Sequence, residues 1–127
     1  MRENWDDPWP SQLRLRENGR ILQITFENGA SYDLDAEYLR VMSPSAEVQG
    51  HRPGEHVTIS GKHQCGIVGI EPVGTYAVRL IFDDLHSTGI YTWRYLHELG
   101  SRYREKWASY EAELKAKGLS RDHPGKA

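Results

Sequence analysis

The fold is decided by residues 69–99, GIEPVGTYAVRLIFDDLHSTGIYTWRYLHEL. Apolar and other residues alternate with period two over residues 76–82, which predicts a β-strand. The face expected to be buried carries Tyr76, Val78, Leu80 and Phe82. The polar run at residues 83–87 is typical of a turn, and residues 89–93 predict the returning strand. This stretch therefore predicts a hairpin that leads into a helix.

Two tight turns precede this hairpin in the chain. Asn18-Gly19 and Asn28-Gly29 tolerate the positive φ angles that short hairpin connections require. They separate alternating runs that begin at Leu13, Arg20 and Ser31. The pattern predicts a three-stranded antiparallel meander.

A short helix is expected over residues 36–42, with the carboxylate of Asp35 as its N-cap. Pro44 disfavours helical backbone in the residue before it, so the helix should stop at Ser43. The glycine-rich segment that follows predicts only short strands, at residues 57–59 and 67–70.

A long C-terminal helix is predicted by apolar residues that recur at steps of three or four. Gly100 interrupts the pattern and predicts a kink or a break between two helices, and Gly118 is the expected C-cap. The apolar stripe consists of Trp93, Leu96, Leu99, Tyr103, Trp107, Tyr110 and Leu114.

These elements predict a single α+β domain within the 127 residues. Its small, mainly antiparallel sheet, made of the meander plus the central hairpin, packs against the C-terminal helix. We expect a flexible N-terminal arm at 1–11 whose Trp5 and Trp9 dock on the domain. The domain proper would span 12–99, a helical extension 100–118, and a disordered tail 119–127.

Composition excludes several classes of function. A net charge of −2 gives no field that attracts nucleic acid or an anionic membrane. The single cysteine, Cys65, allows no internal disulfide and no cysteine-rich zinc motif. The N-terminal residues lack the apolar core of a signal peptide, and no stretch is long and apolar enough to span a bilayer. We therefore expect a soluble, cytoplasmic protein.

The sequence predicts no cofactor outright, and its chemistry-bearing residues leave two interpretations open. Asp83, Asp84 and His86 at the hairpin tip could bind a cation, or they could satisfy backbone groups of the turn. A metal would need further ligands, which His63 or Cys65 could supply, as could His51 and His56. No Ser or Thr follows Gly61-Lys62 as a phosphate-binding loop requires, because His63 stands there.

The central run resembles a known family. The pattern is Gly74-x-Tyr76-Ala77-Val78, then FDDLHSTGIYTW at residues 82–93, and Tyr95-Leu96. It is similar to the family once called DUF971, the gamma-butyrobetaine hydroxylase-like N-terminal domain, and the similarity extends back to Leu13. In the carnitine-pathway hydroxylases this module precedes a jelly-roll oxygenase that holds iron and 2-oxoglutarate. The present chain resembles the stand-alone bacterial form, and the same module also ends some P-loop ATPases that carry iron–sulfur clusters.

The resemblance also implies a zinc site of three cysteines and one histidine. His86 stands at the position of that histidine. The cysteines would follow Leu39-Arg40, but residues 41–47 read VMSPSAE and contain none. The resemblance therefore does not carry zinc over to this chain.

Three functional hypotheses follow. The first is a non-catalytic adaptor for a protein partner, such as a metallo-enzyme or an iron–sulfur assembly factor, because the oxygenase domain and its iron ligands are missing. The second is a zinc or iron site centred on His86, with Asp84 and Cys65 as further ligands. The third is an enzyme with a groove lined by Tyr91 and Trp93.

Aromatic residues are the expected partner contacts. Tyr91 and Trp93 would line the core or a groove, whereas Trp107 and Tyr110 lie on the C-terminal helix. If that helix extends beyond the small sheet, its apolar stripe would remain exposed. We therefore expect a homodimer interface there as one alternative.

Overall fold

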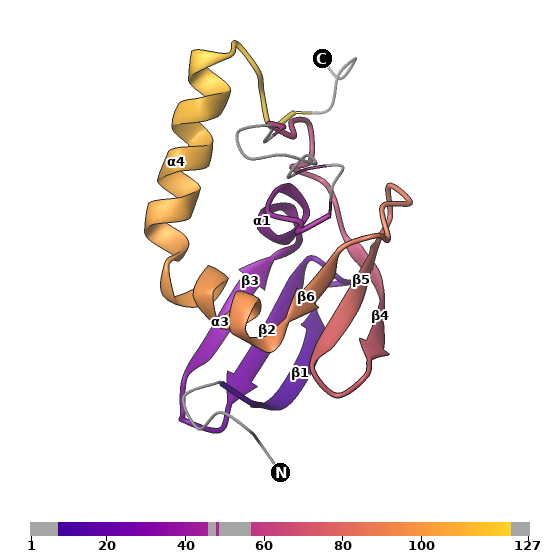
Figure 1. Cartoon of the computed structure of the whole chain (residues 1–127). Helices are drawn as coiled ribbons and strands as arrows, with labels where there is room; N and C mark the ends of the chain where they lie inside the picture. Colours follow the sequence, from indigo (N-terminus) through magenta and orange to yellow (C-terminus); the bar gives the residue numbers. More distant parts are fainter. Residues whose placement is uncertain (1–7, 46–47, 49–56, 123–127) are drawn as a thin grey trace.

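The computed structural model describes residues 8–45, 48 and 57–122 of the chain. These residues form two three-stranded antiparallel sheets together with helices that pack at one end and along one side (Figure 1). The predicted α+β class is confirmed. The meander and the central hairpin, expected in one sheet, lie in two separate sheets because each pairs only with its own neighbours.

The first sheet is the predicted meander. It contains β1 (Pro10–Arg16), β2 (Ile21–Phe26) and β3 (Ser31–Asp35) in that order. The central strand β2 alternates between buried and half-buried residues, as a strand with one face on the core must. Its buried face consists of Leu22, Ile24 and Phe26.

The second sheet contains β4 (Ile67–Val73), β5 (Ala77–Phe82) and β6 (Ile90–Thr92). The predicted central hairpin is confirmed, since Ala77 pairs with Thr92 and Arg79 with Ile90. Tyr76 does not join the buried face, because it lies in the turn before β5 and is 55% exposed.

The two sheets meet where the turn between β1 and β2 contacts the start of β4. The backbone amide of Ile67 donates to the carbonyl of Gly19 at 2.8 Å. A β-carbon on Gly19 would lie 2.1 Å from the carbonyl oxygen of Ile67, so this approach requires glycine. Buried side chains of both sheets, including Leu22, Leu80 and Phe82, form one continuous core.

The helices are α1 (Ala36–Val41), α3 (Trp93–Ser101) and α4 (Tyr103–Ala116). All residues of α1 are buried, and Asp35 occupies its N-cap position without a side-chain hydrogen bond to the helix, contrary to the prediction. The break predicted near Gly100 occurs at Arg102, between α3 and α4. Gly100 itself packs against the ring of Tyr32.

Two expectations about irregular segments are wrong. Residues 57–60 form no strand; instead the hydroxyl of Tyr110 on α4 donates to the carbonyl of Ile59. The tail continues the fold as far as Asp122, because the amides of Gly61 and His63 donate to the carbonyls of Ser120 and Arg121.

The N-terminal arm is attached to the first sheet through the carbonyl of Trp9, which accepts from the amide of Glu27. Trp5 and residues 123–127 lie outside the described part of the chain. None of the helices within the described part is long and apolar enough to cross a bilayer.

Candidate functional site

The turn between β5 and β6 is held in place by the carboxylate of Asp84. Its Oδ2 accepts hydrogen bonds from Arg40 Nε at 2.8 Å and from Lys62 Nζ at 2.6 Å. Its Oδ1 accepts from the backbone amide of His86. Partial burial raises the pKa of Asp84, but the hydrogen bonds from Lys62, His86 and Arg40 outweigh it and lower the pKa to about 2. Asp84 is therefore an ionised structural anchor at neutral pH.

His86 lies beneath this turn among hydroxyl groups. Its side chain is buried, and its Nε2 lies 2.9 Å from Ser43 Oγ and 3.5 Å from Ser45 Oγ. Both serines are buried in the segment that follows α1. We call Ser43, Ser45 and His86 the Ser–His cluster. It joins the central hairpin to the end of α1 from the inside of the fold.

The Ser–His cluster occupies the place where the sequence resemblance implied a zinc site. Ser43 and Ser45 lie in the segment where the cysteines would be, and both contact the expected histidine. Structural zinc is held by thiolates, imidazoles and carboxylates, whereas a neutral serine hydroxyl is a poor ligand. No group of three or more His, Cys, Asp or Glu side chains suited to a metal lies among the described residues. The donor set at His86 therefore does not fit zinc.

The other expected ligands are placed apart from this cluster or are unsuited to metal. Burial raises the pKa of the Cys65 thiol to about 12, with the carboxylates of Asp84 and Asp83 adding to the effect. The thiol is therefore uncharged at neutral pH and is a weak nucleophile. Asp83 Oδ2 accepts from the amide of Gly66, and His63 is an exposed residue near Asp122. His51 and His56 lie outside the described residues.

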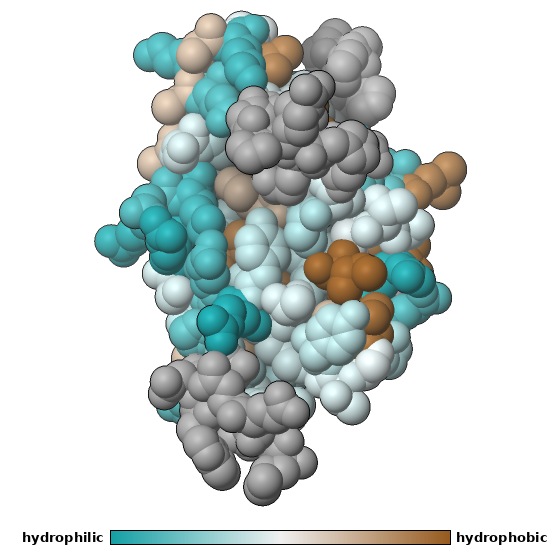
Figure 2. Space-filling view, viewed as in Figure 1, coloured by the Kyte–Doolittle hydropathy of each residue, from teal (hydrophilic) through white to brown (hydrophobic). Residues whose placement is uncertain are grey.

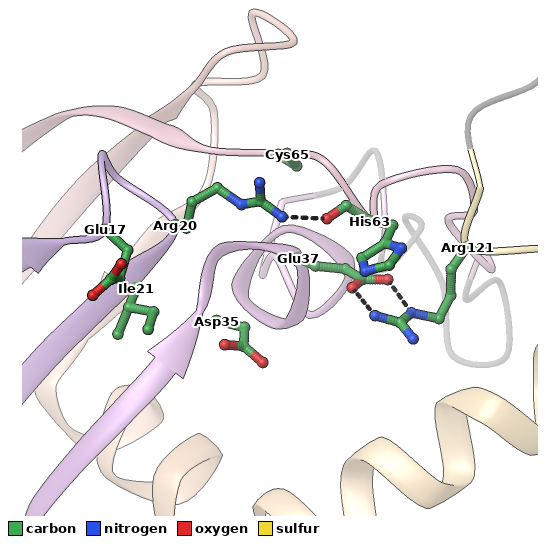
Figure 3. Close-up of a pocket in the computed structure, with 8 residues that line it drawn as sticks. All are labelled: Glu17, Arg20, Ile21, Asp35, Glu37, His63, Cys65 and Arg121. Atoms are coloured by element: carbon green, nitrogen blue, oxygen red, sulfur yellow. Dashed lines mark hydrogen bonds and ion pairs between the residues drawn. The ribbon is translucent and has the colours of Figure 1, made fainter. Parts of the chain in front are cut away.

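A charged pocket of about 270 Å³ is lined by Cys65 together with several charged side chains (Figure 3). Arg121, from the tail, donates two hydrogen bonds of 2.7 Å to the buried carboxylate of Glu37 on α1. Arg20 donates to the carbonyl of His63 at 3.1 Å. Burial and the nearby Glu37 carboxylate raise the pKa of Asp35. Both arginines thus connect separate segments of the chain across this pocket.

The aromatic residues expected to contact a partner contribute mainly to the interior. Tyr91 is fully buried, and its hydroxyl donates to the carbonyl of Leu39 at 2.5 Å. Tyr110 is also buried, and Trp107 is half-buried beneath the guanidinium of Arg121, which lies 5.2 Å from its ring centroid. Val41 and Ile59 cover this part of α4. The apolar stripe of the C-terminal helix is therefore satisfied within the chain rather than left exposed.

Trp93 lies beside a surface pocket. Its Nε1 donates to the carbonyl of Thr75, and the side chain lines a pocket of about 300 Å³. Tyr91 is not among the residues around this pocket, so the two do not form the predicted groove. The other residues around it are Pro8, Trp9, Tyr76, Thr92 and Arg94.

The two most exposed large apolar side chains among the described residues lie on the second sheet and its projecting turn. Leu85 at the tip of the β5–β6 turn is 89% exposed, Val68 on β4 is 66% exposed, and Ile90 on β6 is 37% exposed. Figure 2 shows apolar surface both at this projecting turn and over the second sheet. We call Val68, Leu85 and Ile90 the apolar surface. Sequence reasoning missed it, although Leu85 within the polar run DDLHS was a visible signal.

Fold and site together define a small α+β domain with two three-stranded sheets, in which a buried histidine and a charged turn connect the second sheet to α1 and the segment after it. The model of the family described as gamma-butyrobetaine hydroxylase-like, N-terminal, matches residues 13–97, and the chain belongs to this family. No curated protein matches the chain.

Solved structures agree with this assignment. Two proteins with NMR solution structures share 48% and 43% sequence identity with the chain, with TM-scores of 0.80 and 0.79. The first match covers 94% of each chain, and the second covers 100% of this chain and 98% of the other. A crystal structure from Acidithiobacillus ferrooxidans, of a DUF971 family protein with unknown function, shares 36% identity with a TM-score of 0.59. That match covers 71% of this chain and 90% of the other.

Proposed function

We propose that the chain is a non-catalytic protein-interaction module whose contact site is the apolar surface of the second sheet. The observation that carries this proposal is the exposure of Val68, Leu85 and Ile90 around a turn fixed by buried and ionic contacts. Apolar side chains gain free energy when a partner removes them from water. A firm turn also loses little conformational freedom on binding.

The state of the chemistry-bearing residues supports a non-catalytic role. Asp84 is ionised and accepts from three donors, so it is poorly placed to act as a proton donor at neutral pH. The thiol of Cys65 is buried and protonated. The imidazole of His86 contacts serine hydroxyls inside the fold. Asp84 and His86 thus contribute to holding the turn in place.

The class of partner follows from the family context. The module resembles a domain that accompanies an iron oxygenase or an iron–sulfur ATPase, so the proposed partner is a metallo-enzyme or an iron–sulfur assembly factor. We place this interaction in the cytoplasm. The resemblance supplies this part of the proposal, whereas the exposed surface supports the interaction itself.

Affinity capture from cells that naturally contain the chain tests the proposal. The full chain and the variant Val68→Asp/Ile90→Asp serve as matched baits, and circular dichroism melts confirm that both are folded. We expect one protein to co-purify in stoichiometric amount with the wild type and to fall at least tenfold with the variant. Absence of a stoichiometric partner, or equal capture by both baits, would count against the proposal.

A further inference from the structure

Leu85 adopts a backbone conformation that suits it poorly. Its φ angle is 72°, in the left-handed region where side chains with a β-carbon are uncommon and where glycine or asparagine is favoured. The side chain is 89% exposed, so contacts within the chain do little to offset this strain. The folded domain alone thus gives little reason for a leucine at this position.

The turn that presents Leu85 is held from several directions. The amide of Leu85 donates to the carbonyl of Phe82 at 3.0 Å, and the amide of Phe82 donates to the carbonyl of His86 at 2.9 Å. Asp84 connects the turn to Arg40 and Lys62 through its Oδ2. The position of Leu85 is therefore fixed before any partner binds, which lowers the entropy lost on binding.

A carboxylate that is paired with no cation among the described residues lies two positions from Leu85. Asp84 is compensated by the cations of Arg40 and Lys62. The neighbouring Asp83 is exposed, and within the described part of the chain its carboxylate accepts only the amide of Gly66. One carboxylate without a cationic partner thus borders the exposed leucine. A complementary surface would place a lysine or arginine opposite it.

We propose that Leu85 is the anchor of the interaction module and inserts into an apolar socket, bordered by lysine or arginine, on a protein partner. This proposal rests on the function proposed above and adds the chemistry of the partner. An anchor of this kind contributes a large share of binding, because a few fully desolvated side chains dominate most interfaces.

Substitution separates the role of Leu85 in binding from its role in folding. Leu85→Asn keeps a residue that tolerates positive φ, so we expect an unchanged or higher urea midpoint together with at least a tenfold loss of partner capture. Leu15→Asn is the matched control, because Leu15 is another exposed leucine, on β1, and should leave capture unchanged. Asp83→Asn should weaken capture several-fold at low salt and much less at high salt.

Photocrosslinking tests which residues of the partner surround Leu85. Benzoylphenylalanine is placed at position 85 or at position 15 of the full chain, and crosslinked peptides from native lysate are identified by mass spectrometry. We expect crosslinks from position 85 to apolar residues that have lysine or arginine nearby, and few from position 15. Crosslinks to an acidic surface, or to a second copy of this chain, would overturn the proposal.

The outcomes distinguish this proposal from the function on which it rests. If a partner is lost with Val68→Asp/Ile90→Asp but retained by Leu85→Asn, the interaction module stands and the anchor is wrong. If no stoichiometric partner is captured by the wild type, both proposals fail. A fall in the urea midpoint of Leu85→Asn that matches its loss of capture would also contradict the anchor, because the leucine would then serve folding.

Discussion

Nε2 of His86 lies 2.9 Å from the hydroxyl oxygen of Ser43, inside the fold and beneath the charged turn. The two residues are 43 positions apart in the chain, so their contact joins the end of α1 to the central hairpin. This pair stands at the position where the family resemblance implied a zinc site. A hydrogen bond between side chains thus connects these two segments.

The first prediction concerns metal content. We expect untagged wild-type protein to contain far less than one zinc per chain by elemental analysis, because serine hydroxyls are poor zinc ligands. The variant Ser43→Cys/Ser45→Cys should bind close to one equivalent, since two thiolates then join the imidazole of His86. Ser43→Ala/Ser45→Ala is the control and should bind none. Stoichiometric zinc in the wild type would contradict our interpretation of the cluster.

The second prediction concerns acid stability. The pKa of Asp84 is about 2 in the folded chain, against a value of about 3.9 in an unfolded one. Because the folded-state pKa is lowered, the stabilisation is complete above about pH 5 and is lost as the pH falls toward 2. Allowing for solvent screening, we expect Asp84→Asn to lose about 1 to 2 kcal/mol at pH 7.

Urea denaturation at pH 7 and pH 3 measures this effect. The difference in unfolding free energy between wild type and Asp84→Asn should shrink at the lower pH. The same substitution at Asp33 on β3 provides the control. This carboxylate is also paired with an arginine, Arg16 at 3.6 Å, but its side chain is 53% exposed. A wild-type advantage that stays constant between the two pH values would rule out Asp84 as the titrating group.

The third prediction concerns the tail. Arg121→Ala leaves the buried carboxylate of Glu37 without its two hydrogen bonds, so we expect a loss of about 2 kcal/mol in unfolding free energy. The unfolding free energy of Arg121→Lys should lie between those of the wild type and Arg121→Ala, because an ammonium keeps the charge but cannot make the same two-point contact. Arg104→Ala, an exposed position on α4, should change stability little. If Arg121→Ala and Arg104→Ala unfold at the same urea concentration, the contact contributes nothing.

The fourth prediction concerns the packing of α3 on the first sheet. A β-carbon on Gly100 would lie 2.4 Å from a ring carbon of Tyr32, so Gly100→Ala should cost about 2 to 3 kcal/mol. The same substitution should cost much less in a Tyr32→Ala background, where the ring is absent. Ser101→Ala is the control on the same helix. Equal costs of Gly100→Ala in both backgrounds would show that the contact with the ring is not responsible, because helix propensity alone favours alanine over glycine.

Much of the fold could be predicted because its signals are local. Period-two alternation over β2 and β5 defines these strands. The glycines at positions 19 and 29 define hairpin turns, because they adopt positive φ angles. The division into two sheets could not be predicted. It depends on which strands pair with one another and on long-range contacts such as that of Gly19 with Ile67, and no local pattern encodes a contact between residues that far apart.

The candidate site was only partly predictable for the same reason. The polar turn with Asp84 and His86 is visible in the sequence, but the residues that contact it are scattered. Arg40, Lys62 and Ser43 reach the turn from two other segments. Arg121 lies in a tail that was expected to be disordered, and its contacts with Glu37, Trp107 and the amide of His63 attach it to the domain.

The sequence by itself determined the class of fold, the family, and the positions of Asp84 and His86 in the charged turn. These follow from periodicity and motif, which are properties of neighbouring residues. Only the tertiary structure decided that Tyr91 and Tyr110 are interior while Leu85 is presented to solvent. Burial depends on which distant segments cover a side chain, and that is a property of the whole fold.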